Sequence, residues 1–169
     1  HRLIRRQRQM CIRDRIGSAV AAKIEITIKR IDELFENTEI PIEIGLKLPS
    51  GKYEYIPLGF FTAEHPTLDQ ATTTFTAYDR MMKTTGVYVS ELTYPASAES
   101  VLKEISTGCG VPCNVSGLNG ITIDTAPVGY TYREVIGYIA SLAGGFACVD
   151  RTGTIVIKWY EDNGLPLIH

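Results

Sequence analysis

Apolar and polar residues alternate with a period of two through much of the first half of the chain. In 22–29 the even positions are Ala and Ile while the odd ones are Lys, Glu and Thr, and 40–48 repeats the pattern. This alternation predicts strands with one apolar face. The expected strands are 22–29, 40–48, 53–56, 58–64 and 71–78. A turn is expected at 49–52, which reads Pro-Ser-Gly-Lys. The residues expected to be buried include Ile24, Ile26, Ile42, Ile44, Phe60 and Phe75.

The second half shows helical spacing. Ser97 is a suitable N-cap for a helix whose apolar stripe is Val101, Leu102 and Ile105, with Gly108 as its expected end. The segment Thr131-Tyr-Arg-Glu134 has the form of a capping box. The helix that it opens is expected to bury Val135, Ile136, Ile139, Ala140 and Ala143, and to stop at Gly144-Gly145. A hairpin is expected around 151–153, with a short strand near 121–123.

Strands followed by helices and a hairpin predict the α+β class. We expect an antiparallel, barrel-like or sandwich-like first half, followed by a smaller helix-plus-hairpin α+β subdomain. The expected divisions are 16–92 for the β domain, 93–162 for the α+β subdomain, and 163–169 for a truncated end or linker. The boundary is placed where Tyr94-Pro95 interrupts regular structure.

Residues 1–15 stand apart from this pattern. The run from Arg5 to Arg15 matches, in one reading frame, the translation of a transposon-end adapter used in preparing sequencing libraries. We therefore expect 1–15 to be an artefactual tail without stable structure, and the natural start to be missing. Two other interpretations are a basic arm for nucleic acid or membrane and a disordered tail.

Charge and cysteine content narrow the function classes. Residues 1–15 hold six arginines and one aspartate, so setting them aside changes the formal charge from −2 to about −7. This acidic balance argues against an electrostatic nucleic-acid binder. No apolar run is long enough to span a bilayer, so no membrane partner is expected. Outside residues 1–15 the chain has three cysteines, Cys109, Cys113 and Cys148. A low and odd number of cysteines does not suggest a disulfide framework.

Candidate chemistry is sparse. His65 precedes Pro66 and is more typical of a loop than of a catalytic base, and no Gly-x-Ser-x-Gly elbow or glycine-rich phosphate loop is present. Cys109 and Cys113 flank a Gly-Val-Pro turn, but a zinc site needs further ligands that only distant Cys148 and His65 offer. A disulfide between Cys109 and Cys113 stays possible.

Acidic residues gather between the first two expected strands, at Asp32, Glu33, Glu36 and Glu39. They lack the spacing of a calcium loop, so a solvated acidic turn is the expected interpretation. We therefore assign no catalytic, cofactor-binding or metal-binding residue, and we expect neither a cofactor nor enzymatic activity.

Several stretches, in order, resemble the tail-tip hub proteins of phages and prophages. The stretches are 16–28, 57–64, 72–83, 93–95, 131–140, 150–153 and 159–160. This resemblance implies a non-catalytic structural component of a tail tip, a hub or baseplate protein acting in virion assembly and host attachment. It implies a homotrimer that contacts the distal tail and tape-measure proteins, assembled in the bacterial host cytoplasm and located in the virion.

Other classes remain open beside this resemblance. A carbohydrate- or cell-wall-binding β module could use Tyr53, Tyr55, Tyr88 and Trp159 for stacking, although Trp159 shares a face with Ile155 and Ile157 and is expected in the core. Exposed aromatics in a groove would favour sugar binding, and a ring-forming β surface would favour the hub. A tail-associated wall hydrolase would need a set of acids, bases or metal ligands.

Overall fold

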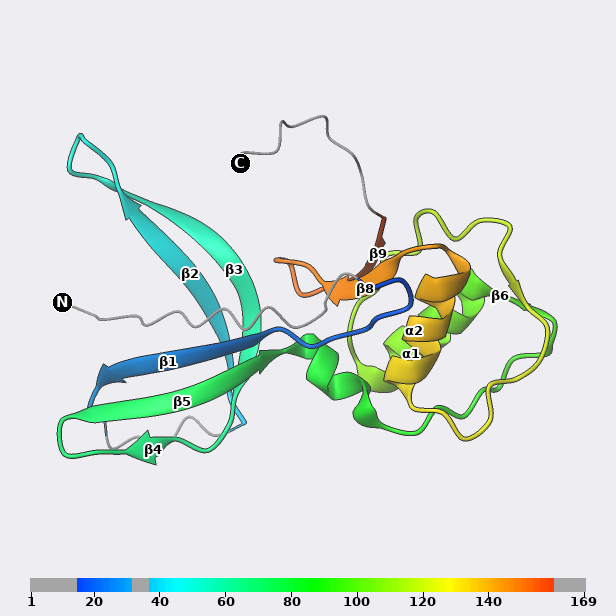
Figure 1. Ribbon diagram of the computed structural model, residues 1–169, viewed down its shortest axis with the longest axis horizontal. Coiled ribbons are helices and arrows are strands. Elements are labelled where there is room, and N and C mark those ends of the chain that lie inside the picture. The colour runs from blue at the N-terminus through cyan, green and yellow to red at the C-terminus, as the bar shows by residue number, and fades with distance from the viewer. Residues whose placement is uncertain (1–14, 32–36, 160–169) are drawn as a thin grey trace.

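The computed structural model describes residues 15–31 and 37–159. Figure 1 shows two parts side by side, a curved antiparallel sheet and a smaller body of two helices with short strands. The α+β class expected from the sequence is confirmed. Residues 1–14, the acidic Asp32, Glu33 and Glu36, and the end 160–169 lie outside the described residues, so the expectations placed on them stay predictions.

The large sheet has the order β1-β5-β3-β2, with β4 also pairing β5. Its strands are β1 (Lys23–Lys29), β2 (Glu39–Lys47), β3 (Tyr53–Ala63), β4 (Thr67–Leu68) and β5 (Thr72–Asp79). All pairs are antiparallel. Within the described residues, β1 and β2 are each paired on one side only, so the sheet is open and the barrel expected from the sequence is not closed.

One face of this sheet is apolar. Its centre is a buried cluster of Phe61, Ala63, Phe75 and Ala77. Ile24 and Ile26 of β1 lie opposite Ala77 and Phe75 and are only partly buried. The predicted burial was right for Phe75, whereas Ile24, Ile26, Ile42 and Ile44 are only half-buried, because no second layer of described residues covers this face.

A bulge in β3 corrects two predictions. The register of β2 and β3 shifts between Ile42 and Glu43, which leaves Leu58 as an extra residue next to Gly59 at φ 130°. The two strands expected at 53–56 and 58–64 are therefore one strand that bends rather than breaks. The buried phenylalanine is Phe61, while Phe60 lies under the Arg80 guanidinium, 4.5 Å from its ring centroid.

Beyond the bulge, residues 43–57 form a two-stranded ribbon, which we call the β2–β3 arm. Its strands pair with each other from Glu43–Pro57 to Lys47–Tyr53. The only β5 partners of β3 are at Phe61–Ala63, so no third described strand joins the arm. The turn predicted at 49–52 closes it, with the Leu48 amide donating to the Lys52 carbonyl at 2.8 Å. In Figure 1 the arm projects away from both the rest of the sheet and the helices.

The second part is built on α1 (Ala98–Cys109) and α2 (Tyr132–Leu142), with the short 3-10 helix η1 (Arg80–Thr85) leading into it. Two antiparallel strand pairs complete it, β6 (Ala96–Ser97) with β7 (Thr122–Ile123) and β8 (Phe146–Val149) with β9 (Ile155–Lys158). Its core holds Leu102, Ile105, Ile136, Ile139 and Ile155, all fully buried.

Both helix starts follow the sequence prediction. The Ser97 side chain accepts a hydrogen bond from the Ser100 amide, and Thr131 and Glu134 form a complete capping box. The expected end of the first helix was wrong. It runs to Cys109, because Gly110, at φ 67°, takes the left-handed cap conformation that only glycine adopts easily. Gly108 instead leaves room for the Tyr132 ring. The second helix ends close to its predicted stop, and Ala143 is its half-buried C-cap.

The segment before β1 belongs to the second core rather than to the sheet. The Gly17 amide donates to the Gly145 carbonyl at 2.8 Å, and the Ala147 amide donates to the Ser18 carbonyl at 2.8 Å. Ala19 and Ala21 pack against the same core. The chain therefore starts its described course on the helical part, crosses into the sheet as β1, and returns through β5.

Along the sequence the chain passes from one apolar cluster to the other twice, between Ala21 and Ala22 and between Ala77 and Met81, and the clusters do not by themselves define independent domains. The boundaries expected at 92–93 and at the two ends stay predictions. None of the described helices is long and apolar enough to cross a membrane.

Candidate functional site: a groove across the second helix

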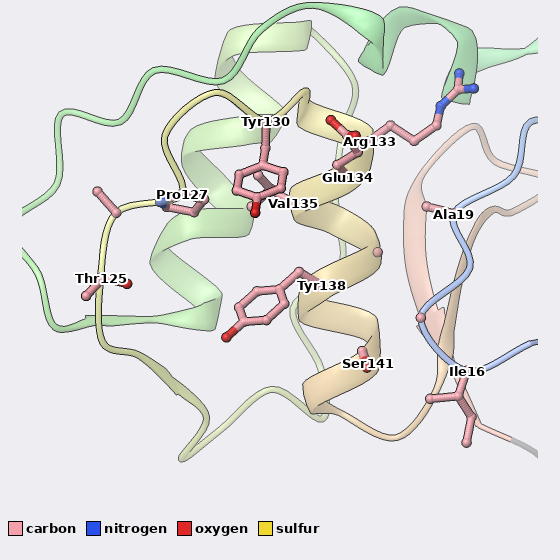
Figure 2. Close-up of a pocket in the computed structure, with 13 residues that line it drawn as sticks. Ile16, Ala19, Thr125, Pro127, Tyr130, Arg133, Glu134, Val135, Tyr138 and Ser141 are labelled. Atoms are coloured by element: carbon pink, nitrogen blue, oxygen red, sulfur yellow. The ribbon is translucent and has the colours of Figure 1, made fainter.

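A groove of about 810 Å³ crosses the exposed face of α2. Figure 2 shows the loop containing Thr125, Pro127 and Tyr130 on one side of the helix and the segment of Ile16 and Ala19 on the other. Its volume is within the range of small-molecule and short oligomer sites. It is the candidate site because it gathers exposed aromatic rings and polar groups in one place.

The wall at Ile16–Ala19 is held close to the helix by a glycine contact. A Cβ at Gly137 would lie 2.7 Å from the Gly17 carbonyl oxygen, so only glycine permits this approach. Two small residues line the groove here, Ala19 in this wall and Ser141 on α2. Small side chains at this point keep the groove open instead of filling it.

The other wall carries the aromatic groups. Tyr130 is 53% exposed and Tyr138 is 52% exposed, and both project to the same side of α2 in Figure 2. The Tyr130 carbonyl accepts a hydrogen bond of 2.8 Å from the Tyr88 amide, which fixes the end of the loop. Val128, in the same loop, is exposed as well. An aromatic face with a hydroxyl at its tip suits a ligand with both apolar and polar surfaces.

The charged residues of the groove already have structural partners. Arg133 donates to the Met81 carbonyl at 2.6 Å and to the Thr84 hydroxyl at 3.4 Å, and burial lowers its pKa. The Glu134 carboxylate accepts from the Thr131 amide at 2.7 Å, and this bond lowers the pKa of Glu134. Both side chains are therefore held by hydrogen bonds within the fold.

A second polar cluster joins the sheet to the helical part. Glu39 on β2 accepts from Arg80 at 2.6 Å and from Lys83 at 3.0 Å. The hydrogen bond from Arg80 is the largest cause that lowers the pKa of Glu39, to about 2. Arg80 also donates to the Gly153 carbonyl at 3.3 Å. Glu39 is therefore an ion-paired residue and not the solvated acid expected from the sequence.

A third cluster clamps the loop after η1 onto α1. The Glu104 carboxylate accepts hydrogen bonds from the Tyr88 hydroxyl, from Ser90 at 2.7 Å and from the Glu91 amide at 2.7 Å. Burial alone would raise the pKa of Glu104, but these donors leave it lowered. Burial and the bond to Glu104 raise the pKa of Tyr88. The cluster is closed on itself and offers no group to a ligand.

The structure does not bring together the other residues considered for chemistry. His65 is exposed on the sheet part, far in sequence and fold from the cysteines. Cys109, Cys113 and Cys148 are half-buried, and the disulfide left open for Cys109 and Cys113 is not formed. Among the described residues, no group of three or more His, Cys, Asp or Glu side chains is placed to hold a metal ion.

The aromatic set considered for sugar stacking is also dispersed. Tyr53 and Tyr55 stack on the β2–β3 arm with ring centroids 6.3 Å apart, whereas Tyr88 is buried in the other part. Trp159 was expected in the core but is 40% exposed. Its ring covers Gly117, and its indole N–H donates to the Ala143 carbonyl at 2.5 Å.

Sequence reasoning missed Tyr130 and Tyr138 as binding candidates. A helical projection would have shown that Tyr138 falls outside the stripe of Val135, Ile136 and Ile139, which marks an exposed aromatic residue. No sequence signal would have placed Ile16 and Gly17 against the same helix, because that contact joins residues about 120 positions apart.

Comparisons with known proteins leave the family open. No family model matches the chain, and no curated protein matches it. Among solved structures it is similar to the 43 kDa tail protein of prophage MuSo2 from Shewanella oneidensis, with 17% identity and a TM-score of 0.48. The match covers 85% of this chain and 48% of that one, so the chain spans about half the length of the tail protein. This similarity is too low to establish a family or a function.

Proposed function

We propose that this chain is part of a structural protein of a phage or prophage tail, located at the tail tip as a hub or baseplate component. The observation that carries the proposal is an antiparallel sheet whose two edges, β1 and β2, pair with no further strand among the described residues, and whose apolar face is only partly buried. The ordered resemblance of 16–160 to tail-tip hub proteins supports it independently. Unpaired edges and uncovered apolar faces are typical of chains that are completed by assembly.

The proposal includes an assembly and a place. We propose that the intact protein is a homotrimer, because a contact between two different surfaces of neighbouring copies can be repeated three times around a cyclic axis and closes without leaving an edge. Its neighbours in the particle would be the distal tail and tape-measure proteins, and its role would be assembly and host attachment. It would be made in the host cytoplasm and carried in the virion.

The test is to look for the protein in particles. Phage tails induced from the host are purified, their proteins are identified by mass spectrometry, and antibody against the exposed loop around Val128 is visualised by immunogold electron microscopy. We expect peptides from the described residues in the tails and gold at the tip end. Particles that lack these peptides, or gold confined to the head, would contradict the proposal.

A second candidate function is binding of a cell-wall carbohydrate, favoured by the groove with its two exposed tyrosines. Tyrosine rings stack on sugar faces while hydroxyl groups at the rim accept and donate hydrogen bonds. The discriminating measurement is calorimetric titration with soluble peptidoglycan oligosaccharides. A saturable heat that disappears in Tyr138→Ala but persists in Tyr55→Ala would favour this function, and no heat with either would leave the tail proposal alone.

We propose no catalytic role for this part of the protein. The carboxylates of Glu39, Glu104 and Glu134 are all held by hydrogen bonds within the fold. A wall hydrolase of this chain would have to release reducing ends from purified peptidoglycan. Such release, or stoichiometric zinc found by elemental analysis, would contradict this part of the proposal.

A further inference from the structure

The β2–β3 arm is an unusual structure for a protein surface. It exposes apolar side chains on both of its faces: Leu46 is 54% exposed on one, and Tyr53 and Tyr55 are 57% and 62% exposed on the other. A two-stranded ribbon is at best marginally stable in water, and an exposed apolar edge invites pairing with another strand. The arm therefore needs a partner that supplies a third strand.

The same sheet offers such a strand at its opposite edge. β1 pairs β5 on one side and no described strand on the other. The path β1-β5-β3-β2 contains four strands that alternate in direction, so β1 and β2 run antiparallel to each other. Copies related by rotation about an axis along the strands would thus place β2 of one copy antiparallel to β1 of the next. The alternation of the sheet would continue unbroken around a ring.

Charge selects one register for this pairing. If Lys29 lies opposite Glu43, then Glu25 lies opposite Lys47, and both facing pairs have opposite charge. In the same register Ile28 faces Ile44 and Ile26 faces Leu46 on the apolar side. Directly opposed side chains on one face stabilise an antiparallel pair when their charges are opposite and destabilise it when they are alike.

The neighbouring registers pair the charged residues of β1 and the arm less favourably. A shift by two residues in one direction places Lys23 opposite Lys47, and in the other direction it leaves both β1 cations without an acidic partner. A shift by four residues places Glu25 opposite Glu43 or Lys29 opposite Lys47. Shifts by an odd number bring the isoleucines of β1 against the charged positions of β2, which the alternation of the strands forbids.

We propose that β1 of one copy of this chain pairs with the arm strand 43–48 of a second copy, antiparallel, with Lys29 opposite Glu43 and Glu25 opposite Lys47. This inference rests on the proposed function, whose trimer it provides with a specific contact. The partner is a second copy because the chain itself carries both complementary edges, and no other partner is needed to satisfy either.

Charge reversal tests the contact in the full chain. Glu25→Lys with Lys29→Glu keeps the net charge and turns both facing pairs into repulsive ones, so we expect the dissociation constant of self-association to rise about tenfold. Adding Glu43→Lys and Lys47→Glu restores opposite charges and should restore the affinity. Glu99→Lys with Lys103→Glu, an exposed pair on α1, is the matched control and should change nothing. Sedimentation velocity over a range of concentrations measures all four proteins.

Cross-linking tests the register and the identity of the partner. In a background with Cys11, Cys109, Cys113 and Cys148 replaced by serine, Lys29→Cys with Glu43→Cys should form disulfides between chains on mild oxidation. Glu25→Cys with Glu43→Cys is the control, because its thiols would be four residues, or about 14 Å, out of register. Denaturing gels without reductant distinguish the products.

Three outcomes overturn the inference. A chain that stays monomeric at every concentration has no such contact. A disulfide within one chain means that the sheet closes on itself. Equal cross-linking of both cysteine pairs means that the strands have no fixed register. Each of these results leaves the tail proposal standing if the protein is found in tail particles, so the two hypotheses fail separately.

Discussion

Replacing Glu39 by glutamine removes the charge that joins β2 to η1. In the folded protein Glu39 accepts from Arg80 at 2.6 Å and from Lys83 at 3.0 Å. The hydrogen bond from Arg80 contributes most to lowering the pKa of Glu39 from 4.5 to about 2, and Lys83 lowers it further. A difference of that size would correspond to a stabilisation of about 3 kcal/mol. The Glu39 side chain keeps 28% of its surface exposed, so solvent screening reduces the expected contribution to about 1–2 kcal/mol.

The sign of the pH dependence follows from the lowered pKa. The stabilisation is fully present above pH 4.5, the ordinary pKa of the group, and is lost as the pH falls toward 2. We therefore expect Glu39→Gln to lose about 1–2 kcal/mol of unfolding free energy at pH 7, and to depend less on pH than the wild type between 5 and 2. Urea titrations at several pH values, each followed by circular dichroism, measure both effects.

Glu54→Gln is the matched control, because Glu54 is an exposed carboxylate of the neighbouring strand β3. It should keep both the wild-type stability and the wild-type pH dependence. If Glu39→Gln loses stability equally at pH 3 and pH 7, the ion pair is not the source of the effect. If it loses none, the salt bridge contributes nothing measurable and the reasoning from its pKa is refuted.

Two further predictions concern the helical part. Gly117→Ala should destabilise the protein by about 2–4 kcal/mol and shift the fluorescence of Trp159 to longer wavelength, because the new Cβ would overlap the indole ring. Gly120→Ala is the control, since Gly120 has a similar φ but open space around it, and should cost only about 1 kcal/mol. Equal losses of stability in the two variants would mean that the ring contact is unimportant. Glu104→Gln should lower the unfolding free energy by about 1–3 kcal/mol, because it weakens the hydrogen bonds that hold the loop on α1. Glu99→Gln on the same helix is the control and should stay within about 0.5 kcal/mol of the wild type. Urea denaturation measures both.

Local patterns in the sequence were sufficient to predict several of the strands and helices. The alternation at 22–29 and 40–48 became β1 and β2, and the Thr131–Glu134 capping box starts α2 as predicted. Each of these predictions depends on residues that lie at most a few positions apart, so a short stretch of sequence is enough to make it. The end of α1 shows the limit of this reasoning. Gly108 and Gly110 are equivalent in the sequence, and only the Tyr132 ring packed against Gly108 distinguishes them.

Long-range arrangement was not predictable from these patterns. Nothing local indicates that Leu58 is accommodated as a bulge, and this single residue decides that Phe61, rather than Phe60, is buried. Ile24 and Ile42 are half-buried because no second layer of residues within 15–31 and 37–159 covers them, and alternation in the sequence cannot reveal this. The candidate groove combines residues from both ends of the described chain, so the sequence predicted its helix but neither of its walls.

The crossing of the chain between the two parts has a mechanical consequence. β1 and β5 are paired neighbours that connect to the helical part at the same end, where the Ala22 amide donates to Asp79 at 2.8 Å and the Asp79 amide donates to the Ala22 carbonyl at 3.0 Å. A force that pulls the sheet away from the helices is therefore divided between two covalent backbones acting in parallel. The load reaches the second core through Ala19 and Met81. A proteolytic cut before Lys23 would leave the covalent connection from β5 to η1 intact, whereas a cut after Asp79 would leave the segment before β1 held on the helical part by noncovalent contacts such as the Gly17–Gly145 hydrogen bond.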